Sequence, residues 1–358
     1  MSNLKKLTQK RLFLPVFCMI LVLCINMIYD LSIGHHFYNF FEITMTNGML
    51  NGRLINILNR GSEAAILALG MTLVVSASAG TDISVGSVMS LAGGVCCVLL
   101  AGFGNVNVNE YAIPLWLGVV AGILVACLCG AFNGFLVAGL KIQPMVATLI
   151  IYSAGRAIGL LLCNSNIVYI NVESFKFFGG YCWIFPTPIL ITVLCIVVTA
   201  LVLKFTALGT YVQAVGINKE AARISGYKSA AIIFICYVVC GLFAGIAGIT
   251  ATSRIYSADT NNIGLNLEMD AILAVALGGN SLGGGKFRLS GSIIGAYTIQ
   301  AITTTLYALG VSSAQAPVFK AIIVILIVTI QSPAVKAYFA KRAAVKNAMM
   351  NAGREAQA

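Results

Sequence analysis

The chain has 358 residues, of which 59% are hydrophobic and only 9% are charged. Soluble domains carry about 25% charged residues, so this composition excludes a soluble protein and indicates a membrane-embedded one. The net charge of +11 does not indicate nucleic-acid binding, because the basic residues stand at the ends of apolar runs rather than on one soluble face. We expect a single all-α, polytopic domain over residues 1–358, with tails at 1–11 and 334–358.

A membrane span needs about 20 apolar residues, and the sequence offers ten candidate runs. The first follows four basic residues and imitates a signal peptide, but Tyr29-Asp30-Leu31-Ser32 is no small-x-small cleavage site, so we interpret it as a retained span. The eighth is too short to cross alone and must be completed by irregular chain. The predicted spans are 12–33, 61–79, 84–103, 113–138, 144–163, 185–204, 229–252, 267–279, 291–309 and 317–333.

Pairs of glycines with GxxxG spacing recur along these runs. Small residues let helix backbones approach closely within a membrane, so the pairs predict tight packing, mostly within this chain, with one or two left for a subunit interface. The pairs are 118 with 122, 130 with 134, 155 with 159, 241 with 245, and 291 with 295.

Two glycine-rich interruptions break the apolar pattern, at residues 80–87 and 278–286. Broken helices at membrane depth are tolerated only where they are buried in protein or line a wet cavity. In the first interruption Thr81, Asp82 and Ser84 are candidates for the substrate pathway, since a carboxylate at the bilayer centre costs roughly 2.5–3.5 kcal/mol and usually has a function. The alternative is that Asp82, aided by Ser84, caps the third span, and both interpretations stay open.

A further polar cluster, DTNNIGLNLEMD, occupies residues 259–270. Its candidate pathway residues are Asn261, Asn262, Glu268 and Asp270, because amides and carboxylates donate to and accept from hydroxyl groups in fixed directions. Capping and hydrogen bonds between loops explain any one of them equally well.

The longest polar interval inside the apolar body is residues 205–228, and capping rules divide it. Asn218 is a good N-cap residue, Glu220 lies where the helix dipole favours an anion, and Gly226 can leave the helix in a left-handed conformation. The pattern predicts a helix of about two turns, roughly 10 Å long. So short a helix needs a partner surface; the alternative is a solvated loop with one helical turn.

The distribution of lysine and arginine predicts the orientation. With both termini cytoplasmic, the inner side holds 16 of these residues and the outer side 5, while Arg156 lies within a span. This asymmetry fits the positive-inside rule, and it places residues 205–228 in the cytoplasm.

Patterns of enzymes and metal sites are missing from the sequence. The eleven cysteines lie in or beside apolar runs without C-x-x-C spacing or a nearby histidine, so we interpret them as packing residues; a Cys163–Cys182 bridge is the alternative. The run 279–287 fails the phosphate-loop pattern at Asn280 and Phe287. We therefore predict no catalytic residue and no metal ligand.

The polar interval resembles the coupling loop of a known family. The pattern Ala214-x-Gly216-x-Asn218-x-x-Ala221-Ala222-x-x-Ser225-Gly226 is similar to the cytoplasmic loop by which permeases of ribose-type sugar ABC importers dock onto their ATPase. The segments 80–86 and 261–272 also resemble signatures of this family, although Ile83 stands where leucine is usual. The resemblance implies that the ATPase contacts are Gly216, Asn218, Glu220, Ala221, Ala222, Ser225 and Gly226.

The resemblance extends from about Asn56 to Gln331 and implies more than local roles. It implies a vitamin-B12-permease-like fold, that of type II ABC importers, in the bacterial inner membrane. The implied partners are an ABC ATPase subunit, a periplasmic sugar-binding protein, membrane lipid and a second permease subunit, different or identical. It implies no cofactor in this chain, since ATP and magnesium belong to the ATPase.

Galactofuranose importer permeases share stretches such as 141–150 and 266–275 with this chain, which implies galactofuranose or a related monosaccharide as cargo. A stand-alone ion-coupled transporter using Asp82 or Asp270 remains the alternative. A membrane enzyme is a third hypothesis, for which the sequence offers no constellation of residues.

Overall fold

The computed structural model describes residues 13–32, 41–46 and 48–331. Within these residues each of the ten predicted runs coincides with a helix, while the predicted tails at 1–11 and 334–358 lie outside them. The helices are α2 (Phe13–Ser32), α3 (Arg53–Ser78), α4 (Val85–Ala101), α5 (Leu115–Gly134), α6 (Pro144–Leu162), α7 (Thr187–Phe205), α10 (Ser229–Ile255), α11 (Leu267–Leu277), α12 (Leu289–Ala308) and α13 (Ala316–Gln331).

Five of the described helices are long and apolar enough to cross a membrane: α3, α5 with the π-helix η2 (Phe135–Gly139) that continues it, α6, α7 and α10. Others, such as α4, are apolar but shorter. Helix α11 has 11 residues, which confirms the prediction that the eighth run is too short to cross alone. The chain is thus a mostly helical, polytopic membrane protein.

The chain divides into two compact units between Thr305 and Leu306. The first holds the helices from α2 to most of α12. In the second, the described residues form the end of α12, a turn and α13. Gly310 takes a left-handed conformation in this turn (φ 79°), and Val311 N donates to Leu306 O at 3.0 Å.

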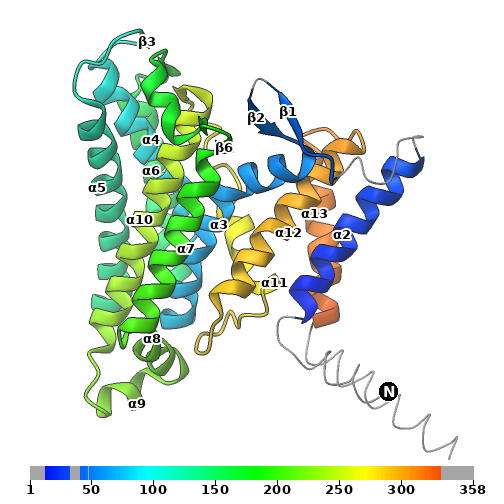
Figure 1. Cartoon of the computed structure of the whole chain (residues 1–358). Coiled ribbons are helices and arrows are strands. Elements are labelled where there is room, and N and C mark those ends of the chain that lie inside the picture. The colour runs from blue at the N-terminus through cyan, green and yellow to red at the C-terminus, as the bar shows by residue number, and fades with distance from the viewer. Residues whose placement is uncertain (1–12, 33–40, 47, 332–358) are drawn as a thin grey trace, which may run out of the picture. The chain divides into compact units, whose positions relative to one another are not determined.

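Helix α3 is the centre of the first unit. It packs against α7, α10 and α11, and α10 in turn packs against α4 and α5 (Figure 1). In its most apolar segment 94% of α3 is buried, against 22% of the corresponding segments in α5, α6 and α7. The last three therefore present broad apolar faces suited to lipid, whereas α3 is enclosed by protein.

The GxxxG pairs pack inside the chain, as predicted for most of them. A Cβ atom on Gly130 of α5 would collide with the carbonyl oxygen of Tyr237 on α10, and one on Gly241 of α10 would collide with the carbonyl oxygen of Ala126. The two backbones thus touch directly. The remaining pairs face α4 (118 with 122, and 155 with 159) and α11 (291 with 295).

Helix α3 begins at Arg53, eight residues before the predicted start. The segment 53–60, RLINILNR, alternates apolar and polar residues at helical spacing, and a search for apolar runs passes over such an amphipathic turn. Arg53 pairs with Asp30 of α2 at 2.5 Å, and this ion pair ties the start of α3 to α2.

The described residues also contain seven short strands, so the all-α prediction was incomplete. Two hairpins are formed by β1 (Thr44–Thr46) with β2 (Met49–Asn51), and by β5 (Tyr181–Cys182) with β6 (Phe185–Pro186). A three-stranded sheet joins three distant loops: β4 (Val168–Ile170) pairs in parallel with β3 (Asn107–Val108) and antiparallel with β7 (Ser257–Ala258). Strands of two or three residues are too short to show an alternating pattern in the sequence.

All eleven cysteines are free thiols, Cys163 and Cys182 included. Seven of them are buried, in keeping with their interpretation as packing residues. Among the described residues, no group of three or more His, Cys, Asp or Glu side chains is placed to hold a metal ion.

Candidate functional site

The polar interval forms two short helices, α8 (Leu208–Ile217) and α9 (Lys219–Ile224). Asn218 separates them, and its Oδ1 accepts hydrogen bonds from the backbone N–H groups of Glu220 at 3.1 Å and Ala221 at 2.9 Å. These bonds satisfy donors that the first turn would otherwise leave unpaired. The predicted N-cap is confirmed.

The other end of α9 also follows the prediction. Gly226 leaves the helix with a left-handed φ of 87°, a conformation that costs glycine little. Ala222 is buried, whereas Ile224 is 84% exposed, an unusual state for a large apolar side chain. Arg223 and Glu220 form an exposed ion pair at 2.9 Å. Helix α9 is thus anchored on one side and open on the other.

Helix α8 was not predicted, and its last turn makes the closest contact of the region. A Cβ atom on Gly216 would collide with the carbonyl oxygen of Ser76, in the last turn of α3, and would lie 2.6 Å from the backbone nitrogen of Gly285. Gly285 N donates to that same Ser76 oxygen at 3.0 Å. The polar interval, the end of α3 and the second glycine-rich interruption therefore meet at Gly216.

The second interruption is closed by one amide side chain. Asn280 Oδ1 accepts from Arg288 N at 2.7 Å, and its Nδ2 donates to Arg288 O at 3.2 Å and to Ser292 Oγ at 2.8 Å. Ser292 in turn is bonded to Thr72 of α3 at 2.6 Å. The loop is thereby fastened to α3 at a second point.

The first interruption is buried. Asp82, 2% exposed, accepts from both the backbone N–H (2.9 Å) and the hydroxyl (2.6 Å) of Ser84, the residue before α4. Asn133 of α5 donates to the Ser84 hydroxyl at 2.8 Å, and Ile83 N donates to Thr148 Oγ1 of α6 at 3.2 Å. Asp82 thus closes a turn onto Ser84, the residue before α4, instead of bonding the N–H groups of the first turn of α4.

The predicted residue Thr81 is also buried, and its hydroxyl has no hydrogen-bond partner within the described part of the chain.

The cluster at residues 259–270 splits between the surface and the interior. Asn261 and Asn262 are exposed and donate backbone N–H groups to Asp259 Oδ1 at 3.2 Å each. Arg156 of α6 donates to the carbonyl oxygens of Thr260 and Asn261, both at 2.7 Å. This bonding holds the loop against α6 and gives the arginine predicted inside a span its partners.

Glu268 and Asp270, in the first turn of α11, are buried. A Cβ atom on Gly86, in the first turn of α4, would collide with Glu268 Oε2 and with the carbonyl oxygen of Gly264. This Glu268 oxygen has no hydrogen-bond partner among the described residues. The structure therefore brings Glu268 against the segment that Asp82 and Ser84 begin, while Asn261 and Asn262 stay with Asp259.

Sequence reasoning missed several residues of this site. Asn133 is the one amide in the apolar run 113–138, and a polar side chain inside a membrane helix is a signal that could have identified it. Ser76 and Gly285 act through backbone atoms, which leave no trace in residue type. Thr148 stands in a run with other small residues and offered no separate signal.

Comparison with known proteins identifies the family to which this chain is related. A family described as branched-chain amino acid transport system / permease component matches residues 53–330. The galactofuranose transporter permease protein YtfT of Escherichia coli (strain K12) is 40% identical over 87% of this chain and 88% of its own length. The fructose import permease protein FruF of Bifidobacterium longum is 36% identical over 92% of this chain and 90% of its own.

The ribose import permease protein RbsC of Escherichia coli (strain K12) is 36% identical over 82% of this chain and 87% of its own length. No solved structure matches the chain significantly. The family consists of permease components, in agreement with the prediction that this chain is not an enzyme. The chain therefore belongs to the family of branched-chain amino acid transport system permease components, as a multi-pass, non-catalytic transmembrane subunit.

Proposed function

We propose that this chain is the membrane-spanning permease subunit of an ATP-driven ABC importer for galactofuranose or a related monosaccharide. Relatives that match most of the chain are named for galactofuranose, fructose and ribose. This shared sugar chemistry supports a monosaccharide cargo, and the relative at 40% identity favours galactofuranose among them.

One observation carries the mechanism: the exposed helix α9 is joined through Gly216 to the end of α3 and to the second interruption. Helix α9 offers Ile224 and its polar side chains to a partner, while Gly216, just before it, contacts Ser76 and Gly285 without space for a methyl group. A packed contact of this kind transmits displacement instead of absorbing it. A partner that moves α9 would therefore move the end of α3 and the second interruption.

In this proposal the ATP-hydrolysing subunit binds the 205–228 segment in the cytoplasm through Gly216, Asn218, Glu220, Ala221, Ala222, Ser225 and Gly226. The pathway passes the buried polar cluster of Thr81, Asp82, Ser84, Glu268 and Asp270, with Asn261 and Asn262 at its mouth. Glu268 Oε2, buried without a partner among the described residues, is an acceptor that a sugar hydroxyl would satisfy.

The proposed architecture has one domain and ten spans in a vitamin-B12-permease-like arrangement, with both termini cytoplasmic. The ten helices that coincide with apolar runs support it, and so does the count of basic residues, 16 inside against 5 outside. The remaining partners are a periplasmic sugar-binding protein and a second permease subunit, different from this one in the preferred arrangement.

The test is reconstitution. The chain is purified in detergent together with the ATPase and the sugar-binding protein of the same organism's importer, then placed in proteoliposomes. We expect the ATPase to copurify and ATP hydrolysis to rise when binding protein and galactofuranose are added, with fructose, ribose and arabinose as competitors. An ATPase that never copurifies, or sugar uptake that collapses with the proton gradient while ATP is clamped, would overturn the proposal.

A further inference from the structure

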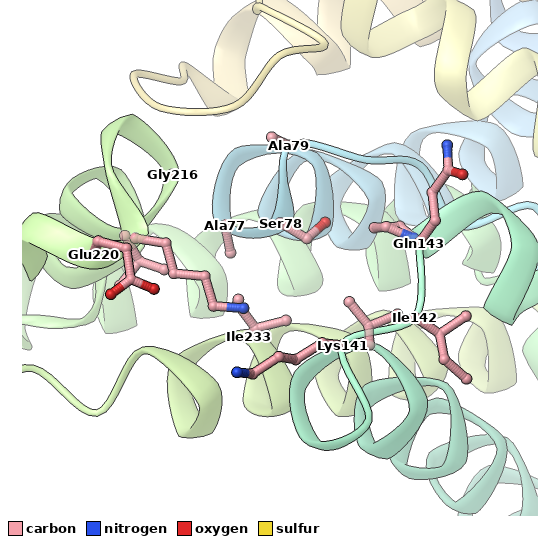
Figure 2. A pocket seen from close by; sticks show the side chains of 13 residues that line it. Ala77, Ser78, Ala79, Lys141, Ile142, Gln143, Gly216, Glu220 and Ile233 are labelled. Atoms are coloured by element: carbon pink, nitrogen blue, oxygen red, sulfur yellow. The ribbon is translucent and has the colours of Figure 1, made fainter. Parts of the chain in front are cut away.

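A cavity of about 390 Å³ opens beside the Gly216 contact. Its walls come mainly from the end of α3, the loop that leads into α6, and the junction of α8 and α9, with Val137 of η2 and Ile233 of α10 completing them (Figure 2). The first contributes 77–79, the second 141–144 and the third Val215, Gly216, Lys219 and Glu220. The cavity thus adjoins the helix proposed to bind the ATPase, but one of its walls comes from a loop outside the predicted docking segment.

The charged side chains that line this cavity leave an excess of positive charge. Lys141 and Lys219 are exposed, and neither forms an ion pair with any residue that the structure describes. The carboxylate of Glu220 is already paired with Arg223 at 2.9 Å. The cavity therefore offers two uncompensated ammonium groups, which suits an anionic ligand.

The backbone around the cavity is unusual as well. Ala79 and Lys141 adopt left-handed conformations, with φ of 54° and 56°. Both follow helix ends, where glycine is the common occupant, and a side chain in this region costs roughly 1–2 kcal/mol. The π-helix η2 ends just before Lys141, and single turns of π-helix concentrate at functional sites. This geometry holds Lys141 at the rim despite its cost.

We propose that this cavity receives acidic side chains of the ATP-hydrolysing subunit, so that Lys141 and Lys219 form a second attachment point beside α9. The inference rests on the proposed function, since a protein seated on α9 would cover the mouth of a cavity that Gly216, Lys219 and Glu220 help to form. It adds Lys141, from a different loop, to the docking surface. With two attachment points on separate segments, binding of the partner would depend on the position of the loop before α6 relative to α9.

The first experiment uses the unmodified complex. A carbodiimide joins lysine amines directly to carboxylates that touch them, and mass spectrometry then identifies the coupled peptides. We expect products that link both Lys141 and Lys219 to Asp or Glu of the ATPase. Copurifying ATPase without coupling at Lys141 would overturn the inference while leaving the proposed function standing, whereas an ATPase that does not copurify would overturn both.

The second experiment removes the charges. The double variant Lys141→Gln with Lys219→Gln should weaken ATPase binding about three- to tenfold at low salt, with the difference shrinking at high salt. Lys204→Gln removes the same charge at the end of α7, outside the cavity, and should leave affinity unchanged. Loss of anionic lipid or inorganic phosphate from the double variant, at unchanged ATPase affinity, would overturn the inference and assign the cavity to a phosphate group.

Discussion

The two interruptions of the membrane helices look alike in sequence, but the structure holds them differently. The first interruption lies in residues 79–84, between α3 and α4, and is fastened by buried side chains from α5 and α6, with Asp82 and Ser84 only 2% and 1% exposed. The second interruption lies in residues 278–288, between α11 and α12, which expose Ser281 to Gly283. These residues are fastened by the amide of Asn280, by the Gly285–Ser76 backbone bond and by Phe287, which packs against the core.

This difference separates a fixed part from a movable part. Local opening requires few buried contacts and solvent-exposed backbone bonds; Ser281 to Gly283 of the second interruption are exposed, whereas Thr81 to Ser84 of the first are buried. It is also the interruption that touches Gly216, next to the exposed helix α9. We infer that displacement of α9 acts on residues 278–288, while residues 79–84 stay in place as a wall.

The largest effect is expected from Gly216→Ala. Its methyl group would overlap the Ser76 carbonyl, and forced backbone shifts of this kind cost about 1–3 kcal/mol. Sugar uptake should fall more than about tenfold. Gly209→Ala, also in α8, is the control, because its methyl group would lie 3.3 Å from the nearest atom, the Leu203 carbonyl oxygen, a contact that a shift of a few tenths of an ångström relieves. Equal uptake in the two variants would contradict the proposed coupling between α9 and the second interruption.

The next largest effect concerns Asp82. Asp82→Ala leaves the N–H and the hydroxyl of Ser84 buried without their acceptor, at a cost of about 1–3 kcal/mol of stability. Asp82→Asn keeps an acceptor oxygen of the same size, so it should retain most of the thermal stability and uptake. Thermal stability is measured by melting curves in detergent, and uptake is measured in ATP-clamped vesicles with an uncoupler. Asn behaving like Ala would mean that the charge itself is needed, as in an ion-coupled carrier.

Asn280→Ala is expected to lower the stability of the protein less than Asp82→Ala does. Its effect on dynamics should be confined to the second interruption. The variant loses the bonds to Arg288 and Ser292, so amide hydrogen exchange over 281–287 should accelerate while that of 81–84 stays slow. In the unmodified protein the same contrast should appear in weaker form. Equal exchange rates in the two interruptions would contradict the division into fixed and movable parts.

The smallest effect is expected from Asn218→Ala, which removes the N-cap of α9 at a cost of about 0.5–2 kcal/mol to that helix alone. Because α9 is short and exposed, ATPase affinity should fall a few-fold without loss of membrane insertion. Asn218→Ser, with a side chain that also caps well, is the matched control and should bind normally. A binding curve for the ATPase on both variants decides; identical loss in both would show that the Asn218 side chain contacts the partner itself.

Much of the fold could be read from residues close together in sequence. Apolar runs located ten helices because the length of such a run decides whether a helix can be buried in lipid or protein. The ends of α9 followed from Asn218 and Gly226 because capping is a property of neighbouring residues. Family-like motifs also marked the segments around Asp82 and Glu268.

Only the tertiary structure decided what those segments touch. The bond from Gly285 to Ser76 joins positions 209 residues apart (285 − 76) through backbone atoms that every residue possesses, so no residue pattern encodes it. Asn133 and Thr148 acquire their roles from helices that happen to pass Ser84 and Ile83. The sequence determined where the helices break, by local propensity and hydropathy. Which break is locked and which is left to move was decided by packing between distant segments.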